Sequence, residues 1–262
     1  MKICITTIVS GKYQWYIPLF LDRIRKEYPE CVPLVFIRGA CELPHESQGG
    51  CITGEYGIGT YREYPEDAST TACLRFVMNG FALRQFDYTL ITDVDILMKR
   101  EDPPFWEQRL SSMHKHGLEC YDNYTVSTNR TYGNMRVPGV HFVTEDWWDR
   151  TAAARESEAG YLKANKVDYN YDEYMLGNLI IESKLPLPKN IPALWNMHGL
   201  HLGSWRRGEW KHRIPPAHVT NQIVELLRDD GFMQKVEISS RNLPDLKDTF
   251  GLFMREWGRH AR

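Results

Sequence analysis

The chain has 262 residues, of which 42% are hydrophobic, 25% charged and 12% aromatic, so its composition is that of a folded globular protein. Its 32 basic and 34 acidic residues give a net charge of −2, which argues against a nucleic-acid partner because phosphate binding favours a basic surplus. No apolar run approaches the roughly 20 residues that span a bilayer. A strand-like segment follows Met1 and Lys2 directly, leaving no room for a signal peptide, so we expect a cytoplasmic protein.

The first third of the chain predicts strands that alternate with helices. Strands are expected over 3–9, 33–37 and 88–92, helices over 16–28 and 68–83, and a long surface loop over 39–66. This alternation indicates a mostly parallel sheet covered by helices on both faces.

The rest of the chain is less regular. Helices are expected over 102–116, 145–163, 172–183 and about 219–229, a strand over 137–143, and a basic, aromatic tail at the end. Because no internal repeat and no long linker is found, we expect one domain over residues 1–262.

The most informative short pattern is Asp93-Val94-Asp95, which directly follows the strand over 88–92. In extended backbone the two carboxylates share one face while Val94 points to the other. The carboxyl edge of a sheet is where open α/β folds bind ligands, and paired carboxylates there suit Mg²⁺ or Mn²⁺. Alternatively, one aspartate caps the next turn and the other is simply exposed.

A second acidic pair, Asp172-Glu173, opens the helix predicted over 172–183. Glu173 lies three residues before Leu176 and so shares its buried side, where a carboxylate in the first turn can point into a cleft. The alternative is that both acids only stabilise the start of the helix through its free N–H groups and its dipole.

Histidines and basic residues gather in a Gly-containing loop late in the sequence. His198 and His201 suit a metal only if a carboxylate joins them. The cationic stretch that follows suits a diphosphate, although a solvated surface loop is the alternative. Its basic residues are Arg206, Arg207, Lys211 and Arg213, with Trp205 just before them and Trp210 among them.

Together these segments resemble GT-A-fold, sugar-nucleotide-dependent glycosyltransferases, and family six in particular, the histo-blood-group A/B and α-1,3-galactosyltransferase group. Residues 8–13 (Ile-Val-Ser-Gly-Lys-Tyr) resemble that family's uridine-contacting start, and residues 86–95 its metal-binding strand. Residues 138–142 (Pro-Gly-Val-His-Phe) resemble the lining of its sugar pocket, and residues 171–176 its H-D-E-S-x-L run.

Two segments depart from family six. Residues 201–206 (His-Leu-Gly-Ser-Trp-Arg) look more like the H-x-G-x-x-K loop of family eight, the glycogenin group, with Arg206 in place of the lysine. Tyr171 replaces the family-six histidine before Asp-Glu, a change at a position tied to acceptor recognition. The membrane anchor and stem of the animal enzymes are also missing, which agrees with an enzyme of the cytosol.

The resemblance implies an α/β fold with a mixed, mostly parallel sheet in a single domain. Residues 1–100 would form the nucleotide- and metal-binding half, and 101–262 the acceptor and catalytic half. It implies transfer from a nucleotide-diphosphate sugar, with UDP as the favoured nucleotide, to a glycan or other hydroxyl acceptor, with Mn²⁺ or Mg²⁺ and with retention favoured over inversion.

The resemblance also implies a role for each candidate residue. Asp93 and Asp95 would hold the metal with His201, and Glu173 would stabilise or attack the sugar, or act with Asp172 as general base under inversion. The nucleotide would contact Ile8, Ser10, Tyr13, Val94, Arg206 and Lys211, and the transferred sugar or acceptor would contact Gly139, Val140, His141 and Trp205.

Two other functions remain open from the sequence. A nucleotidyltransferase also uses a metal and an α/β sheet, but Ser10-Gly11-Lys12-Tyr13 is too short for its Gly-rich loop with Arg and Lys. A sugar-nucleotide- or glycan-binding module without turnover is the alternative outside the enzymes.

Overall fold

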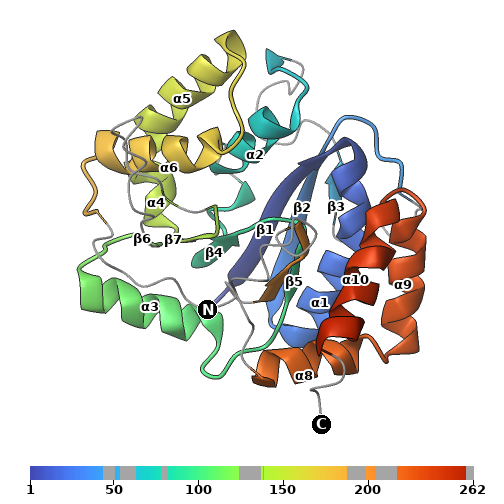
Figure 1. Cartoon of the computed structure of the whole chain (residues 1–262). Helices are drawn as coiled ribbons and strands as arrows, with labels where there is room; N and C mark the ends of the chain where they lie inside the picture. Colours follow the sequence, from blue (N-terminus) through green and yellow to red (C-terminus); the bar gives the residue numbers. More distant parts are fainter. Residues whose placement is uncertain are drawn as a thin grey trace.

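The computed structural model describes residues 1–43, 51–53, 63–77, 82–123, 137, 139–187, 199–203 and 217–257, with the backbone alone at 51–53, 217–220, 222, 256 and 257. A six-stranded sheet in the order β3-β2-β1-β4-β7-β6 forms the centre of the molecule (Figure 1). The four strands β3 to β4 run parallel, whereas β7 and β6 pair in antiparallel fashion. Their bounds are β1 Ile3–Ser10, β2 Cys31–Arg38, β3 Cys51–Thr53, β4 Tyr88–Ile91, β6 Tyr121–Asp122 and β7 His141–Thr144.

Helices cover both faces of this sheet (Figure 1). The 3-10 helix η1 (Gly11–Tyr16) and α1 (Ile17–Glu27) lie on one side with α9 (Asp230–Ser240) and α10 (Pro244–Trp257), while α2 (Ala68–Val77) lies on the other. No helix in the described part of the chain is both long and apolar enough to cross a bilayer. The remaining helices are α3 Phe105–His116, α4 Asp146–Arg150, α5 Ala152–Ala164, α6 Tyr171–Glu182 and α8 Ala217–Leu226.

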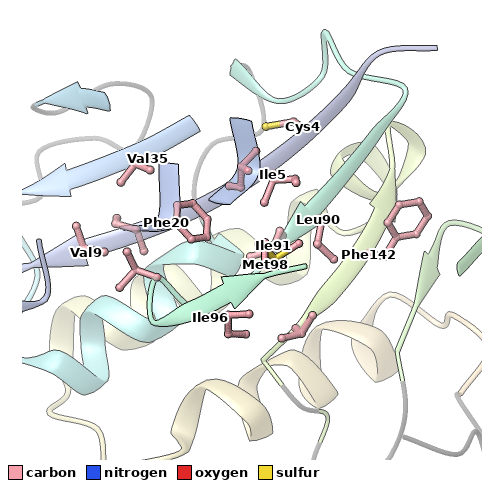
Figure 2. Packing of buried hydrophobic residues seen from close by; sticks show 14 of the residues in the cluster. Cys4, Ile5, Val9, Phe20, Val35, Leu90, Ile91, Ile96, Met98 and Phe142 are labelled. Atoms are coloured by element: carbon pink, nitrogen blue, oxygen red, sulfur yellow. The ribbon is translucent and has the colours of Figure 1, made fainter. Parts of the chain in front are cut away.

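Strand β1 is buried along almost its whole length because helices cover it on both faces. This explains its continuous run of apolar and threonine residues, which is typical of a central parallel strand. Ile5, Val9 and Phe20 lie in the core where α1 meets the sheet, and Leu90 continues this core along β4 (Figure 2).

The α/β fold class and the mixed, mostly parallel sheet are confirmed. The elements that differ from the prediction are short strands, one divided helix and the C-terminal helices. Strand β3 lies within the segment expected to be a loop, and the expected helix over 145–163 is two helices that meet at Thr151. The expected strand over 137–143 begins only at His141, and the expected tail instead forms α9 and α10. The Asp229 side chain accepts a hydrogen bond from Phe232 N and caps α9, a signal visible in the sequence.

A small two-stranded ribbon lies beside the main sheet and was not expected. It pairs β5 (Ile96–Met98) with β8 (Gly199–His201) in antiparallel fashion, across about a hundred residues of sequence. Three-residue strands show too little periodicity to be recognised from sequence.

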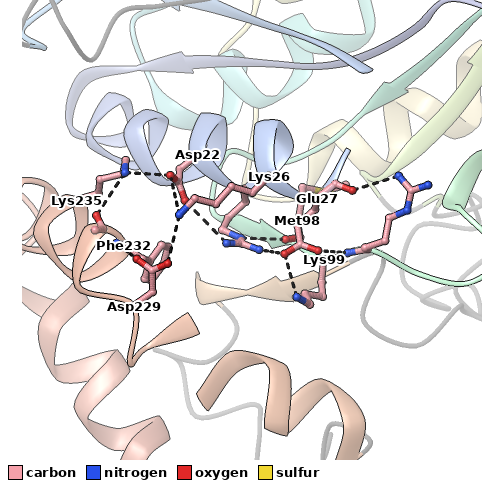
Figure 3. Close-up of polar contacts among 11 residues, drawn as sticks. Asp22, Lys26, Glu27, Met98, Lys99, Asp229, Phe232 and Lys235 are labelled. Carbon is pink, nitrogen blue, oxygen red and sulfur yellow. Dashed lines mark hydrogen bonds and ion pairs between the residues drawn. The ribbon is translucent and has the colours of Figure 1, made fainter. Parts of the chain in front are cut away.

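Ion pairs connect α1 to α9 and to the end of β5 (Figure 3). Asp22 lies 3.0 Å from Lys235 and 3.5 Å from Lys26, and Lys99 lies 2.9 Å from Glu27. These contacts attach the C-terminal helices and the β5 strand to the main body of the fold. We call this group the α1 charge cluster; its members are Asp22, Arg23, Lys26, Glu27, Lys99, Asp229 and Lys235.

Candidate active site

The two aspartates of the D-x-D pattern lie just beyond the carboxyl end of β4. Thr92 N still donates to Thr6 O of β1, at 3.0 Å, and the chain then leaves the sheet. Val94 is buried, while the Asp93 and Asp95 side chains retain 34% and 12% of their exposure. The triplet lies in a turn and not in the extended backbone that the sequence predicted, because Ile96 N donates to Asp93 O at 3.4 Å. Both carboxylates are nevertheless at the carboxyl edge of the sheet, where open α/β folds bind ligands.

The β5–β8 ribbon brings His201 to Asp95. His201 is the register partner of Ile96, so its ring reaches Asp95 with Nε2 3.1 Å from Oδ1. The backbone N–H of Gly203 donates to Asp95 Oδ2 at 3.1 Å. A Cβ atom on Gly199 would lie 2.0 Å from Leu97 O, so the close approach of these two strands requires glycine there.

These three side chains have the arrangement of a metal site. One ligand atom from each of Asp93, Asp95 and His201 lies within 4.8 Å of the other two. Two carboxylates and one imidazole suit Mn²⁺, and suit Mg²⁺ less well because of the nitrogen ligand. Burial raises the pKa of Asp95, but the His201 ring and nearby backbone N–H groups lower it by more, so the net shift is downward. A low pKa favours the ionised carboxylate that metal binding needs.

Arg75 on α2 is a functional candidate that the sequence analysis missed. Its buried guanidinium pairs with Asp93 and also donates from Nη2 to Asp172 Oδ2 at 2.7 Å. Burial lowers the pKa of Arg75, but the two carboxylates raise it by more, so it remains a cation. The signal in the sequence is a single arginine within the apolar stripe of a helix. Arg75 therefore joins Asp93 to α6.

Helix α6 presents the second acidic pair at this same place. Asp172 is held by Arg75, and the half-buried Glu173 follows it in the first turn. The backbone carbonyl of Glu173 accepts a hydrogen bond from Val137 N at 3.1 Å, which fixes the start of the helix. Gly139 packs against this junction, since a Cβ there would lie 2.4 Å from Arg75 Nη2. The structure thus brings Asp93, Asp172 and Gly139 together, although they are far apart in the sequence.

The residues expected near the nucleoside lie at the carboxyl end of β1. The Ser10 hydroxyl shares a hydrogen bond of 3.0 Å with that of Thr71 on α2, and the half-buried Tyr13 ring stacks on Tyr16. The side chains of Ile8 and Val94 are buried.

The expected substrate-binding segment 139–141 divides in two. Gly139 is at the site, but the Val140 side chain is buried and the His141 ring has no exposed surface. His141 lies in the core, 4.6 Å from the Trp147 ring, and contacts Asn123. Its burial and the charge of Arg109 lower its pKa to about 3. The position of His141 therefore gives no support to the expected substrate contact.

His198 and the basic, aromatic stretch after His201 lie outside the described residues. The named residues of that stretch are Trp205, Arg206, Arg207, Trp210, Lys211 and Arg213, and most of the expected loop over 39–66 lies outside the described residues too.

No family model matches the sequence, and no curated protein matches it. Among solved structures, it is similar to the galactosyltransferase LgtC in complex with donor and acceptor sugar analogs, with a TM-score of 0.44 and 14% identity over 67% of this chain and 70% of LgtC. It is similar to the glycosyltransferase GlyE of Streptococcus pneumoniae TIGR4, with a TM-score of 0.47 and 12% identity over 81% of this chain and 50% of GlyE.

A third similar structure is 4-diphosphocytidyl-2C-methyl-D-erythritol synthase, with a TM-score of 0.34 and 10% identity over 68% of this chain and 98% of that one. The chain spans about half the length of GlyE. Membership of glycosyltransferase family six or eight stays a prediction.

Proposed function

We propose that this protein is a GT-A-fold, metal-dependent glycosyltransferase that moves a sugar from a nucleotide diphosphate, with UDP as the favoured nucleotide, to a hydroxyl group of a glycan or other acceptor. The observation that carries the proposal is the convergence of Asp93, Asp95 and His201 at a sheet edge, connected through Arg75 to the acidic first turn of α6. In this proposal, the metal ligands serve the departure of the diphosphate, and the second pair of carboxylates acts on the sugar or the acceptor hydroxyl.

Asp93, Asp95 and His201 would hold Mn²⁺ or Mg²⁺. When bound, the cation supplies Lewis-acid stabilisation of the charge that develops on the leaving diphosphate. Arg206 and Lys211 follow His201 in the chain, and in this proposal they donate to the diphosphate oxygens. Ser10, Tyr13 and the backbone at Ile8 and Val94 would border the nucleoside, because the carboxyl end of β1 lies beside that of β4.

Glu173 is the proposed catalytic carboxylate. Its place in the first turn of α6, next to the Arg75-bound Asp172, puts negative charge close to the metal-site edge. Under retention, which we favour, Glu173 stabilises the positive charge that develops on the sugar or attacks it directly. Under inversion, Glu173 or Asp172 accepts the proton of the acceptor hydroxyl.

The direct test combines binding with turnover. Titration calorimetry should detect UDP binding that requires Mn²⁺, and UDP-galactose or UDP-glucose should release UDP slowly in the presence of Mn²⁺ and not with EDTA. Binding without any UDP release, with a range of sugar acceptors added, would instead identify a sugar-nucleotide-binding module. Pyrophosphate release from UTP and a sugar 1-phosphate would identify a nucleotidyltransferase.

The Glu173→Gln variant separates chemistry from binding. Loss of the carboxylate charge should lower turnover by about a hundredfold or more, while the affinity for UDP with Mn²⁺ stays close to that of the wild type. The matched control is Glu182→Gln, at the exposed far end of the same helix, which should leave both unchanged. Wild-type turnover in Glu173→Gln would remove this residue from the mechanism.

A further inference from the structure

Two tyrosines near the start of α6 are exposed although aromatic rings are usually buried. Tyr161, in the last turns of α5, keeps 46% of its surface exposed, and Tyr169, in the α5–α6 connection, keeps 72%. The other large exposed hydrophobic side chains among the described residues are Met1, Val32, Ile181 and Leu187, which are aliphatic. Exposed aromatic rings beside a candidate active site are characteristic of ligand contact.

The Tyr171 ring supports one face of the Tyr161 ring. The two rings stack with centroids 5.5 Å apart and planes 21° apart. The Tyr171 hydroxyl donates to the buried carboxylate of Glu158 at 3.2 Å, and Asn178 donates to the other Glu158 oxygen at 3.0 Å. One face of Tyr161 is therefore supported by a fixed ring, so a ligand that stacks on its exposed part meets a preorganised surface.

The backbone that joins Tyr169 to α6 is also fixed. Asn170 has a left-handed conformation with φ of 69°, which is uncommon for a residue other than glycine. Tyr171 N donates to Asp168 O, and Glu173 N donates to Asn170 O, so the turn leads directly into α6. This turn places Tyr169 in solvent just before the acidic first turn.

We propose that Tyr161 and Tyr169 form a stacking subsite for a sugar ring of an oligosaccharide acceptor, beyond the ring that carries the reacting hydroxyl. The proposal rests on the proposed function, because it takes the acidic first turn of α6 as the place of the reaction. From the half-buried Glu173 in that turn, the half-buried Tyr171 and then the exposed Tyr161 that stacks on it lie progressively nearer to solvent. A pyranose presents a face of C–H groups that packs on an aromatic ring by dispersion and weak C–H contacts. The exposed Asp168 and half-exposed Asn165 beside the tyrosines offer polar groups of the kind that bind sugar hydroxyls.

The test measures disaccharide binding to the whole protein by saturation-transfer NMR. The probes are lactose, maltose, cellobiose and diacetylchitobiose, which differ in ring type and linkage. At least one should bind the wild type, and both Tyr161→Ala and Tyr169→Ala should weaken that binding by about tenfold. Tyr161→Phe and Tyr169→Phe keep the rings and should retain it. The matched control is Ile181→Ala, which removes a 51% exposed side chain at the other end of α6 and should change nothing.

Three results would overturn the proposal. It fails if none of the four disaccharides binds, if either alanine variant binds as the wild type does, or if the phenylalanine variants lose binding as well. Because Tyr169 is largely exposed, Tyr169→Ala remains informative even if Tyr161→Ala misfolds.

Calorimetry of UDP with Mn²⁺ on the same samples separates this proposal from the proposed function. UDP binding that is unchanged in the tyrosine variants supports an acceptor subsite distinct from the donor site. Disaccharide binding that depends on the rings, in a protein that binds no UDP, would support the carbohydrate subsite and contradict glycosyl transfer. UDP binding without disaccharide binding would contradict the subsite alone.

Discussion

The α1 charge cluster and the charged residues at the sheet edge are built from the same residue types but differ in balance. In the α1 charge cluster, three carboxylates face four cationic side chains, so each acid has a nearby counter-charge. At the sheet edge, the described residues supply four carboxylates, from Asp93, Asp95 and the first-turn pair Asp172 and Glu173, against the guanidinium of Arg75 and the imidazole of His201.

This difference separates a cluster that attaches elements of the fold to one another from a cluster that is suited to bind a cation. A balanced cluster satisfies its own charges and gains nothing from a further ion, whereas adjacent carboxylates in excess repel one another until a cation joins them. Arg75 relieves part of that repulsion, and a divalent cation would relieve more. We therefore expect substitutions in the two clusters to have opposite profiles, with metal and donor binding affected at the sheet edge and stability alone affected at α1.

The largest expected effect follows Asp95→Asn. The substitution removes the charge of one proposed metal ligand and replaces one of the two oxygens that contact His201 and Gly203, so Mn²⁺-dependent turnover should fall by about a thousandfold or more. Mn²⁺ affinity, measured by electron paramagnetic resonance, should fall with it, while circular dichroism should show an intact fold. Wild-type Mn²⁺ affinity in Asp95→Asn would contradict the metal site itself.

The second effect concerns Arg75→Gln, which leaves Asp93 and Asp172 without their shared cation. Removal of one partner from a buried ion pair should destabilise the protein by about 3 kcal/mol in urea unfolding. Because the freed carboxylates repel one another, Mn²⁺ should raise the melting temperature of this variant more than that of the wild type. An equal or smaller Mn²⁺ shift would show that Arg75 does not balance the charge of the metal-site carboxylates.

The third effect comes from the α1 charge cluster. Asp22→Asn weakens pairs with Lys26 and Lys235, whose side chains are partly exposed, so the loss of unfolding free energy should be only about 1 kcal/mol. Mn²⁺ affinity and UDP binding should stay at wild-type values, which makes this variant the matched control for Asp95→Asn. A drop in Mn²⁺ affinity here would break the contrast between the two clusters.

The sequence predicted those parts of the site that local patterns determine. The place of Asp93 and Asp95 follows from the buried strand before them, and the acidic start of α6 is a property of helix termini, so both could be located in advance. The turn that Asp93, Val94 and Asp95 form was not predicted. Arg75 could not be located in advance, because its role depends on partners 18 and 97 residues away that only the packing of α2 against α6 brings together.

His201 could be predicted only in part. Its type and its loop suggested a ligand, but the pairing of β5 with β8 that carries it to Asp95 has no local signature, because each strand is three residues long. At His141, a match to a motif predicted a contact with the sugar or acceptor, and the structure places the ring in the core. A motif specifies an order of residues along the chain and not the direction in which each side chain points, which depends on strand register.

His141 gives the smallest predicted effect and shows a third way to accommodate an ionisable group, as a neutral ring without a counter-charge. Its pKa is lowered from 6.5 to about 3, so below pH 6.5 the unfolded chain binds a proton that the folded chain does not. Stability is therefore lost as the pH falls toward the folded pKa, and between pH 7 and pH 6 this one group costs about 0.7 kcal/mol. His141→Gln cannot titrate, so in urea unfolding its stability should fall by that much less than the wild type over this interval. An identical pH dependence in the two proteins would mean that the ring takes up a proton as readily in the folded state as in the unfolded chain, and hence that it is not enclosed in the core.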